Sequence, residues 1–343
     1  MGWYQVNGKI NLDIRFGKLQ YYFELVRNIT IINDDSATGK STLVKNLSDR
    51  DDIGYSSVKI SSGGYQVLTL NKDSWKAAQF MPELYKDSII FIDEMQYFID
   101  TPQFSKFVKD TGSYFVLITR SDIENLSYSV KEIYSLDIKG NKHTLKRKYN
   151  IKKNFYNGNG YGINPQYFLT EDRNSGYQFF KNVARKFNAT CEYADGKSNI
   201  KKFLYKFKTE NKYKGKIKMV ICDGAAIGSN IKDITLNLDS NTLLFLPESF
   251  EYMILNSGVV GKNEKILDRL KHTYNYVNYN KHYNWERYYT EYLCEITENY
   301  NEYRYSKSNL KKKYLEEGVT NQILENNYLC FKRSDSTNKM TII

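Results

Sequence analysis

Short apolar runs recur in the first half of the chain, each followed by polar residues. Residues 29–32, 88–92 and 114–118 are continuous and rich in β-branched side chains, which is typical of strands buried on both faces of a sheet. Helices are expected to begin at 43–47 and to cover 102–110. The pattern predicts a β-rich start up to residue 32, followed by alternating helices and strands that include short strands within 53–72.

Two features mark the end of this first region. Residues 133–139 and 142–149 flank Gly140-Asn141 and predict a basic hairpin. Residues 157–162 read Asn-Gly-Asn-Gly-Tyr-Gly, and such residues permit positive φ while offering no packing surface. We therefore expect a domain boundary there.

A second alternation follows the boundary and has the rhythm of a parallel sheet covered by helices. The expected elements are strand 167–170, helix 176–187, strand 189–193, helix 198–208, strand 217–222, helix 229–234 and strand 242–246. From about residue 262 the chain becomes helical, tyrosine-rich and mixed in charge.

The length of 343 residues exceeds what one small core organises, so several domains are expected. The predicted class is α/β, with a first sheet domain over 1–156, a second parallel-sheet domain over 163–261 and a helical C-terminal extension over 262–343. Hydrophobic residues make up 41% and charged residues 26%, as in globular chains. No apolar run approaches the roughly 20 residues that span a bilayer.

The four cysteines, at 191, 222, 294 and 330, lie far apart and form no CxxC pair. With only three histidines the chain has few zinc ligands, so we expect reduced cysteines and a cytoplasmic protein without membrane contact.

The net charge of +11 is unevenly distributed. Segment 139–153 holds seven Lys or Arg and no acid, and segment 181–218 holds twelve against three acids. A phosphate-rich partner such as nucleic acid explains this distribution. The alternative is a codon bias toward Lys, Asn, Ile and Tyr, which leaves solvated lysine faces without a partner.

The loop after residues 29–32 is a near match to the Walker A pattern, in which backbone N–H groups and a helix N-terminus surround phosphates. Lys40 is expected to reach the β- and γ-phosphates of ATP, and the Ser41 hydroxyl to ligate Mg²⁺. The departure is Asp34, which stands where the pattern has its first glycine. The alternative is a Ser/Thr-rich turn before a structural helix. The expected ATP-binding residues are Ser36, Ala37, Thr38, Gly39, Lys40, Ser41, Thr42 and Arg120.

Residues 89–94 resemble Walker B, an apolar strand that ends in acids. Asp93 is expected to hold Mg²⁺, and Glu94 is expected to polarise the attacking water as the catalytic base of this site. Arg120 follows the strand 114–118, where such ATPases place a γ-phosphate sensor. The β-rich start resembles the opening of an ABC-type ATPase domain, but no LSGGQ-like segment lies between the two Walker elements, so a reduced domain is expected.

Acids follow three predicted strands of the second domain. Glu171 follows strand 167–170, Asp223 follows strand 217–222, and Glu248 and Glu251 follow strand 242–246. Ligands of parallel α/β sheets bind beyond the carboxyl ends of strands, so these acids are expected to converge. Carboxylates suit Mg²⁺ and Mn²⁺, which support phosphodiester chemistry. The simpler interpretations are a turn at Asp223-Gly224 and an acid at a helix start for Glu171.

These residues resemble the TOPRIM domains of topoisomerases, primases and the overcoming-lysogenization-defect (OLD) family nucleases over about residues 165–255. Glu171 resembles the glutamate after the first strand, residues 194–199 the GKSN-type loop, and Asp223 the first acid of the DxD motif. Ala225 replaces the second acid. The resemblance implies Glu171, Asp223 and Glu248 as metal ligands, and Glu171, Asp223, Glu248 and Glu251 as catalytic acids. A P-loop domain followed by TOPRIM is also the OLD-type arrangement.

The sequence thus favours an ATP-binding and ATP-hydrolysing protein with Mg²⁺ as cofactor. Its second domain is interpreted as a Mg²⁺-dependent nuclease that acts on nucleic acid in defence against phage or mobile elements. The alternative is a nucleotide-dependent binding switch whose degenerate TOPRIM-like domain recognises a partner protein or nucleic acid. Asp34 and Ala225 favour this alternative. A homo-oligomer is a further expected partnership of the chain. A P-loop kinase fits poorly, because Glu94 is a hydrolase feature and no Arg-rich lid is evident.

Overall fold

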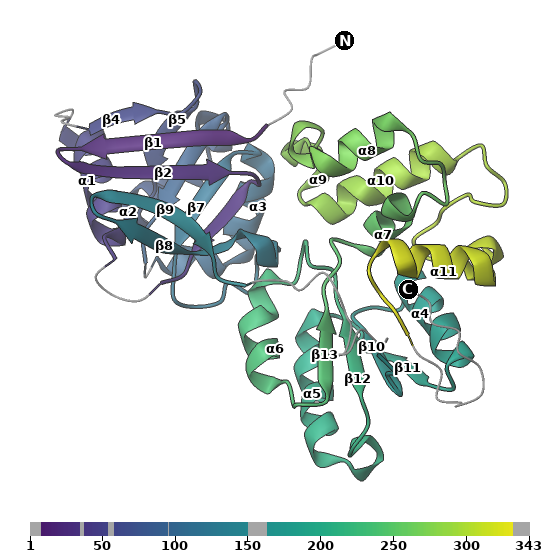
Figure 1. Cartoon of the computed structure of the whole chain (residues 1–343). Helices are drawn as coiled ribbons and strands as arrows, with labels where there is room; N and C mark the ends of the chain where they lie inside the picture. Colours follow the sequence, from purple (N-terminus) through teal and green to yellow (C-terminus); the bar gives the residue numbers. More distant parts are fainter. Residues whose placement is uncertain (1–7, 35–37, 54–57, 95, 150–162, 332–343) are drawn as a thin grey trace. The chain divides into compact units, whose positions relative to one another are not determined.

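The computed structural model describes residues 8–34, 38–53, 58–94, 96–149 and 163–331 (Figure 1). They form two compact units. Unit 1 comprises Met1–Asn150 and His272–Asn284, and unit 2 comprises Ile151–Lys271 and Trp285–Ile343. Each unit is built around its own sheet with helices, so the predicted α/β class is confirmed.

The two units differ from the domain limits expected from the sequence. The boundary at 157–162 lies outside the described residues. The region 262–343, expected to be one extension, is divided: residues 272–284 belong to unit 1 and the rest to unit 2.

The sheet of unit 1 has nine strands in the order β4-β1-β2-β9-β8-β3-β7-β6-β5. One half is parallel, because β3 pairs with β7, β7 with β6, and β6 with β5, while β8 runs parallel to β3 on its other side. These strands are β3 (Ile29–Ile32), β5 (Gln66–Thr69), β6 (Ser88–Ile92), β7 (Tyr114–Ile118) and β8 (Ile133–Lys139). Since β7 lies between β3 and β6, the residues after these three strands meet at one edge.

The other half of this sheet is mostly antiparallel and extends the β-rich start of the chain. Its strands are β1 (Ile10–Phe16), β2 (Leu19–Leu25), β4 (Val58–Ser61) and β9 (Lys142–Arg147). In β1, buried residues alternate with more accessible ones, whereas every residue of β3, β6 and β7 is buried. The central strands and the hairpin of β8 and β9 confirm the predictions from hydrophobic pattern.

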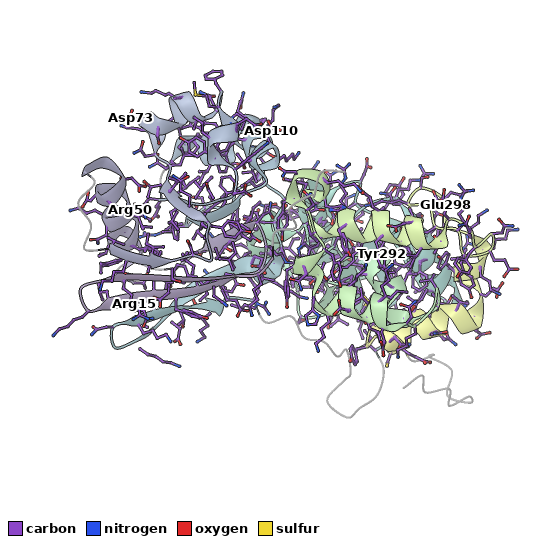
Figure 2. The ribbon with its side chains drawn as sticks, turned by 90° about the horizontal axis from the view of Figure 1, so that it is seen from above. Arg15, Arg50, Asp73, Asp110, Tyr292 and Glu298 are labelled. Carbon is purple, nitrogen blue, oxygen red and sulfur yellow. The ribbon has the colours of Figure 1, made fainter. Side chains whose placement is uncertain are left out.

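Local hydrogen bonds stabilise three helices of unit 1. Arg50 lies on α1 (Lys40–Ile53) (Figure 2). It donates to the Val67 carbonyl and so ties the helix to β5. Asn71 caps α2 (Lys72–Ala78) by accepting from two backbone N–H groups. Thr101 caps α3 (Pro102–Thr111), which ends at Gly112 in the left-handed region.

An aromatic cluster fixes α2 and α3 against the sheet. Trp75 of α2 stacks on Phe98 at 4.8 Å between ring centroids and meets Phe104 and Phe107 edge-on. Phe104 in turn packs on Phe115 of β7 at 5.7 Å. These rings are buried, so they connect both helices to a central strand.

A segment from late in the chain completes unit 1. It contains α9 (Tyr279–His282), whose Tyr279 packs edge-on against Tyr114 of β7 at 6.0 Å. Tyr283 accepts a hydrogen bond from the Ser127 N–H at 3.2 Å, and the Lys109 ammonium lies 4.4 Å from its ring centroid. Residues 272–284 are therefore part of this core.

Unit 2 holds a parallel four-stranded sheet in the order β11-β10-β12-β13. Its strands are β10 (Tyr167–Thr170), β11 (Thr190–Tyr193), β12 (Lys218–Ile221) and β13 (Thr242–Phe245). The connecting helices are α4 (Ser175–Lys186), α5 (Ile200–Thr209) and α6 (Ile231–Asn237). The alternation predicted from sequence is confirmed, and every residue of β10 and β12 is buried.

The strand order of this sheet creates a switch point. From β10 the chain moves outward to β11, then returns past β10 to β12 and continues to β13. The connections leaving β10 and β12 therefore go in opposite directions, and with right-handed crossovers α4 covers one face while α5 and α6 cover the other (Figure 1). A crevice opens beyond the carboxyl ends of such a strand pair.

The remaining helices of unit 2 form a layer of their own, made of α7 (Phe250–Ser257), α8 (Glu264–Lys271), α10 (Trp285–Thr297) and α11 (Glu317–Asn326). The buried Asn327 amide donates to the Met253 carbonyl of α7 at 2.9 Å. Tyr292 lies on α10 (Figure 2). The Arg269 guanidinium of α8 lies 4.4 Å from its ring centroid. Tyr288, Tyr289 and Tyr292 of α10 are buried, so this part of the tyrosine-rich sequence contributes to packing.

Candidate functional site

The first candidate site lies where β3 leads into α1. Lys40 is the first residue of α1 and is buried. Its ammonium donates to the Asp34 carbonyl at 3.0 Å and to the Thr38 hydroxyl at 2.8 Å. Oxygen atoms of the loop therefore surround the ammonium beside a helix N-terminus, where backbone N–H groups also favour anions.

Gly39 has a position that only glycine fits. Its φ is +84°, and a Cβ there would lie 2.7 Å from the hydroxyl oxygen of Tyr21 and 3.2 Å from Nε2 of His143. The Tyr21 hydroxyl donates to the Gly39 carbonyl at 2.9 Å, and its ring stacks on His143. Burial raises the pKa of Tyr21 to about 12, so it remains a donor. Strands β2 and β9 thus hold the end of the loop in place.

Asp34 departs from the Walker A pattern, and the structure gives it a different partner. Its Oδ2 atom accepts a hydrogen bond from the Leu136 N–H of β8 at 2.9 Å. Beside it, the Asn33 N–H donates to the Tyr134 carbonyl at 2.8 Å. The Asp34 side chain therefore anchors the loop to β8, which explains how an acid is accommodated at this position.

The ends of β6 and β7 bring charged groups to the same edge. Asp93 accepts a hydrogen bond from the Glu94 N–H at 2.8 Å. The Glu94 carboxylate pairs with Arg120, which follows β7, at 3.0 Å. Ser41 and Thr42 are exposed in the first turn of α1, while Ser36 and Ala37 lie outside the described residues. Lys40, Glu94 and Arg120 therefore share one edge of the sheet.

The second candidate site lies at the switch point of unit 2. Glu171 directly follows β10 and Asp223 comes just after β12, the two strands whose connections leave in opposite directions. The Gly196 N–H donates to the Glu171 carbonyl at 2.9 Å, which places the loop of residues 194–199 beside it. The predicted convergence of Glu171 and Asp223 agrees with the strand order.

Gly224 allows the loops after β12 and β13 to come close. Its N–H donates to the Pro247 carbonyl at 2.6 Å, and a Cβ there would lie 2.8 Å from that oxygen. Ala225 is buried and donates its N–H to the Glu248 carbonyl at 3.2 Å. The segment is a turn, as the simpler interpretation holds, and the same turn carries Asp223 into the crevice.

A small pocket collects the acids of unit 2. Glu171, Asp223 and Glu251 line it together with Lys307, and it encloses about 40 Å³ of space for the centres of water molecules. Glu248 is buried but does not line the pocket, so Glu251 is the late acid that joins the other two. A volume of this size admits a few waters or one ion and excludes a nucleotide.

Burial and mutual repulsion change the acidity of these groups. Burial, with the charges of Glu286 and Asp172, raises the pKa of Glu171 to about 7. Burial, Glu286 and Glu251 raise the pKa of Asp223 well above its ordinary value. The Oε2 atom of Glu171 is enclosed and makes no hydrogen bond. The pocket therefore lacks positive charge relative to its carboxylates.

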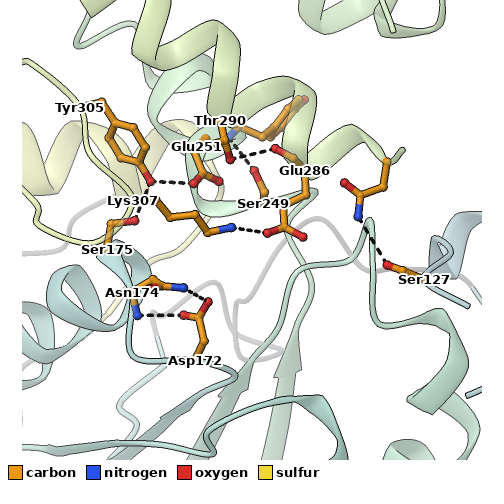
Figure 3. Close-up of polar contacts among 12 residues, drawn as sticks. Ser127, Asp172, Asn174, Ser175, Ser249, Glu251, Glu286, Thr290, Tyr305 and Lys307 are labelled. Carbon is orange, nitrogen blue, oxygen red and sulfur yellow. Dashed lines mark hydrogen bonds and ion pairs between the residues drawn. The ribbon is translucent and has the colours of Figure 1, made fainter. Parts of the chain in front are cut away.

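Sequence reasoning missed four residues of this site: Ser175, Glu286, Tyr305 and Lys307. The Lys307 ammonium pairs with Glu286, and Tyr305 donates to Oε1 of Glu251 at 2.7 Å (Figure 3). The hydroxyl groups of Tyr305 and Ser175 lie 2.6 Å apart. None of these residues stands in a motif, because the fold brings them together over more than a hundred positions.

The metal ligands expected from the TOPRIM resemblance do not form a metal site. Across the parts of the chain that the structure describes, no three His, Cys, Asp or Glu side chains converge closely enough to hold a metal ion. In the pocket of unit 2 the ammonium of Lys307 lies among the carboxylates instead. The donor set of Glu171, Asp223 and Glu248 therefore does not fit a divalent ion in this state.

The two basic segments contribute differently to the surface. On β9, Lys142 and Arg147 line a groove with Tyr22 and Tyr134. In segment 181–218, some of the charge is used internally: Lys218 is buried and pairs with Asp239 at 2.8 Å.

A second basic groove runs along α4 in unit 2. Arg173, Lys181 and Arg185 line it with Tyr177, and no acid is among its lining residues. The groove holds about 620 Å³ of space for the centres of water molecules. The Lys181 ammonium lies 5.2 Å from the Tyr177 ring centroid. Asn174 and Tyr177 line both this groove and the carboxylate pocket, so the two are adjacent.

The structure also shows the state of the cysteines and the character of the helices. All four cysteines are free thiols. Among the described residues, no helix combines the length and the apolar composition needed to cross a bilayer.

Gly224→Ala should destabilise the protein, because the new methyl group meets backbone oxygen atoms that have no freedom to rotate away. We expect a loss of about 1–3 kcal/mol in the free energy of unfolding, measured by denaturant titration. Gly318→Ala in the first turn of α11 is the matched control, since nothing lies within 4 Å of its added Cβ. The control should be neutral or slightly stabilising. Equal effects of the two changes would contradict the close approach at Gly224.

Comparison of the chain with protein-family models, with curated proteins and with solved structures gives no match. The function proposed below therefore depends on the geometry of the two sites.

Proposed function

We propose that the protein is a nucleotide-dependent switch: unit 1 binds and hydrolyses ATP, and unit 2 binds nucleic acid. The observation that carries the proposal is that Lys40, Glu94 and Arg120 follow three neighbouring parallel strands at one edge of the sheet, with Glu94 and Arg120 paired at 3.0 Å. Triphosphate hydrolysis uses a cation that binds the phosphates, a carboxylate that polarises the attacking water and a second cation near the γ-phosphate.

The loop between β3 and α1 fits a triphosphate. Lys40 would contact the β- and γ-phosphates in place of the loop oxygen atoms that it now binds. Ser41 and Asp93 would hold Mg²⁺, which neutralises phosphate charge when bound. The Gly39 position supports this assignment, because its positive φ and the nearby Tyr21 hydroxyl exclude a side chain at the end of the loop.

Glu94 and Arg120 give the site a way to respond to the nucleotide. In the described state the Glu94 carboxylate is engaged by Arg120. A γ-phosphate competes for Arg120, because a guanidinium binds phosphate strongly. Glu94 then becomes available to accept a proton from water. Phosphate binding to Arg120 would thus release Glu94 to act as the catalytic base.

Lys40→Ala should abolish ATP binding, because it removes the buried ammonium from the phosphate loop. Glu94→Gln is the matched control at the same edge: it should bind ATP normally but hydrolyse it about 10²–10⁴-fold more slowly, since an amide accepts no proton. Binding of labelled ATP and release of phosphate measure the two effects. Unchanged affinity in Lys40→Ala would refute the nucleotide site, and full turnover in Glu94→Gln would refute the role of Glu94.

The α4 groove supports nucleic acid as the partner of unit 2. Its cations, Arg173, Lys181 and Arg185, face no lining acid, and Tyr177 adds an aromatic ring. Arg173 and Arg185 are exposed. Cations neutralise backbone phosphates and rings stack on bases, so this combination suits single-stranded nucleic acid.

Reversing all three groove cations to glutamate should weaken binding of a single-stranded oligonucleotide and reduce its salt dependence. The slope of log K against log salt is negative, and each lost phosphate contact makes it shallower by about 0.7. For three contacts, the magnitude of the slope should therefore fall by roughly 2. The control reverses Lys232, Lys265 and Lys312, which are exposed residues of unit 2 outside the groove. A matching loss in the control would show that only net charge matters.

A second candidate function is metal-dependent cleavage of nucleic acid in unit 2. The observation in its favour is that Glu171, Asp223 and Glu251 line one pocket at the switch point, next to the α4 groove. The ammonium of Lys307 in the same pocket weighs against it, and so does Ala225 in place of an acid.

Cleavage of a labelled oligonucleotide with Mg²⁺ or Mn²⁺ tests this candidate. If unit 2 is a nuclease, Asp223→Asn should abolish cutting, because it removes a ligand that nothing replaces. Asp195→Asn, in a nearby loop, is the control and should cut normally. An inert wild-type protein would contradict the nuclease and favour the binding function.

A further inference from the structure

The segment 305–310 of unit 2 is fastened to α4 by a ladder of hydrogen bonds. The Ser175 N–H donates to the Lys307 carbonyl at 2.8 Å. The Gln178 amide donates to the Ser308 carbonyl at 2.8 Å and accepts from the Leu310 N–H at 2.9 Å. We call this segment the strap. Because its backbone is held at several points, the strap fixes where the Lys307 side chain begins.

The strap delivers one ammonium into a group of carboxylates. Lys307 lines the pocket with Glu171, Asp223 and Glu251, and its ammonium pairs with Glu286 of α10 (Figure 3). Burial alone would lower the pKa of Lys307, but Glu286, Glu251 and Asp223 raise it above its ordinary value, so it remains charged. Lys307 is thus the cation that Glu286, Glu251 and Asp223 share, whereas Lys197 is the cation that acts on Glu171.

The acids not paired with Lys307 have weaker compensation. Tyr305 donates to Glu251, and Ser175 lies beside the same hydroxyl. The enclosed Oε2 atom of Glu171 has no hydrogen-bond partner. A cation that entered the pocket would meet this atom, the Asp223 carboxylate and Glu251. The Oε2 atom of Glu171 could therefore bind a cation, and in the described state no hydrogen bond occupies it.

We infer that Lys307 is a built-in cation that takes the place of a divalent metal, so that its ammonium keeps Mg²⁺ and Mn²⁺ out of the carboxylate pocket of unit 2. Two physical reasons support this. A divalent ion needs six or more oxygen ligands or waters, and the Lys307 side chain takes up part of the lining of a small pocket in which these would have to fit. An ammonium close to a divalent cation is also repelled.

This inference rests on the proposal that unit 2 binds nucleic acid without cutting it in its described state. It adds that the pocket would bind a metal ion if the Lys307 ammonium were absent. The two proposals fail separately, because metal binding is measured without nucleotide or nucleic acid, whereas the switch is measured by binding of both.

Titration of Mn²⁺ into the full-length protein without nucleotide, followed by paramagnetic resonance of the free ion, tests the inference. The wild-type protein should show no saturable site in unit 2. Lys307→Ala should gain one Mn²⁺ per chain, and the double variant Lys307→Ala with Asp223→Asn should lose it again. Lys307→Arg keeps the charge and should behave as the wild type does.

Two results would overturn the inference. One is a wild-type Mn²⁺ site that Asp223→Asn removes, since Lys307 would then not exclude metal. The other is a folded Lys307→Ala protein that gains no Mn²⁺. Should Lys307→Ala fail to give a cooperative thermal transition, Lys307→Gln provides the same loss of charge in a polar side chain of similar reach, and the same two outcomes decide.

Discussion

The parallel pairing of buried strands is the constraint on which both candidate sites depend. In a parallel sheet every strand ends at the same edge, so residues that follow different strands are brought together by backbone hydrogen bonds alone. In unit 1 this places Lys40, Glu94 and Arg120 at one edge. In unit 2 it places Glu171 and Asp223 at the switch point between β10 and β12. The chemistry of each site is supplied by loops that the central strands hold in position.

Within unit 2, the buried charges impose a second requirement. Removing carboxylates from water is costly, and the cost is recovered only if each finds a cation or a hydrogen-bond donor. Lys307 and Tyr305 satisfy Glu286 and Glu251. Glu171 is left with an unpartnered oxygen. The helical layer and the strap are therefore as important for this pocket as the sheet that carries its acids.

The sequence predicted the parts of the molecule that follow from local pattern. The apolar runs at 29–32, 88–92 and 114–118 became central strands, because continuous hydrophobicity is needed for burial on both faces. Glu171 and Asp223 were found because they follow such strands. Lys307 and Glu286 stand in ordinary charged sequence, and only packing between distant segments gives them a role. Glu251 could not be separated from Glu248 by spacing, since the choice depends on how α7 begins after β13.

The segment 272–284 has a consequence for how the protein is made. It belongs to unit 1, yet the ribosome completes it only after the whole sheet of unit 2 and α8 have been synthesised. Tyr114 and Gly112 must wait for Tyr279 and Asn280, which are separated from them by more than 160 residues of chain. Domains usually fold as they emerge, N-terminal first, but here the first unit stays incomplete until late in translation. A nascent chain arrested before residue 272 would expose the surface of β7 and α3 that α9 covers, and a fragment ending at residue 150 would keep it exposed.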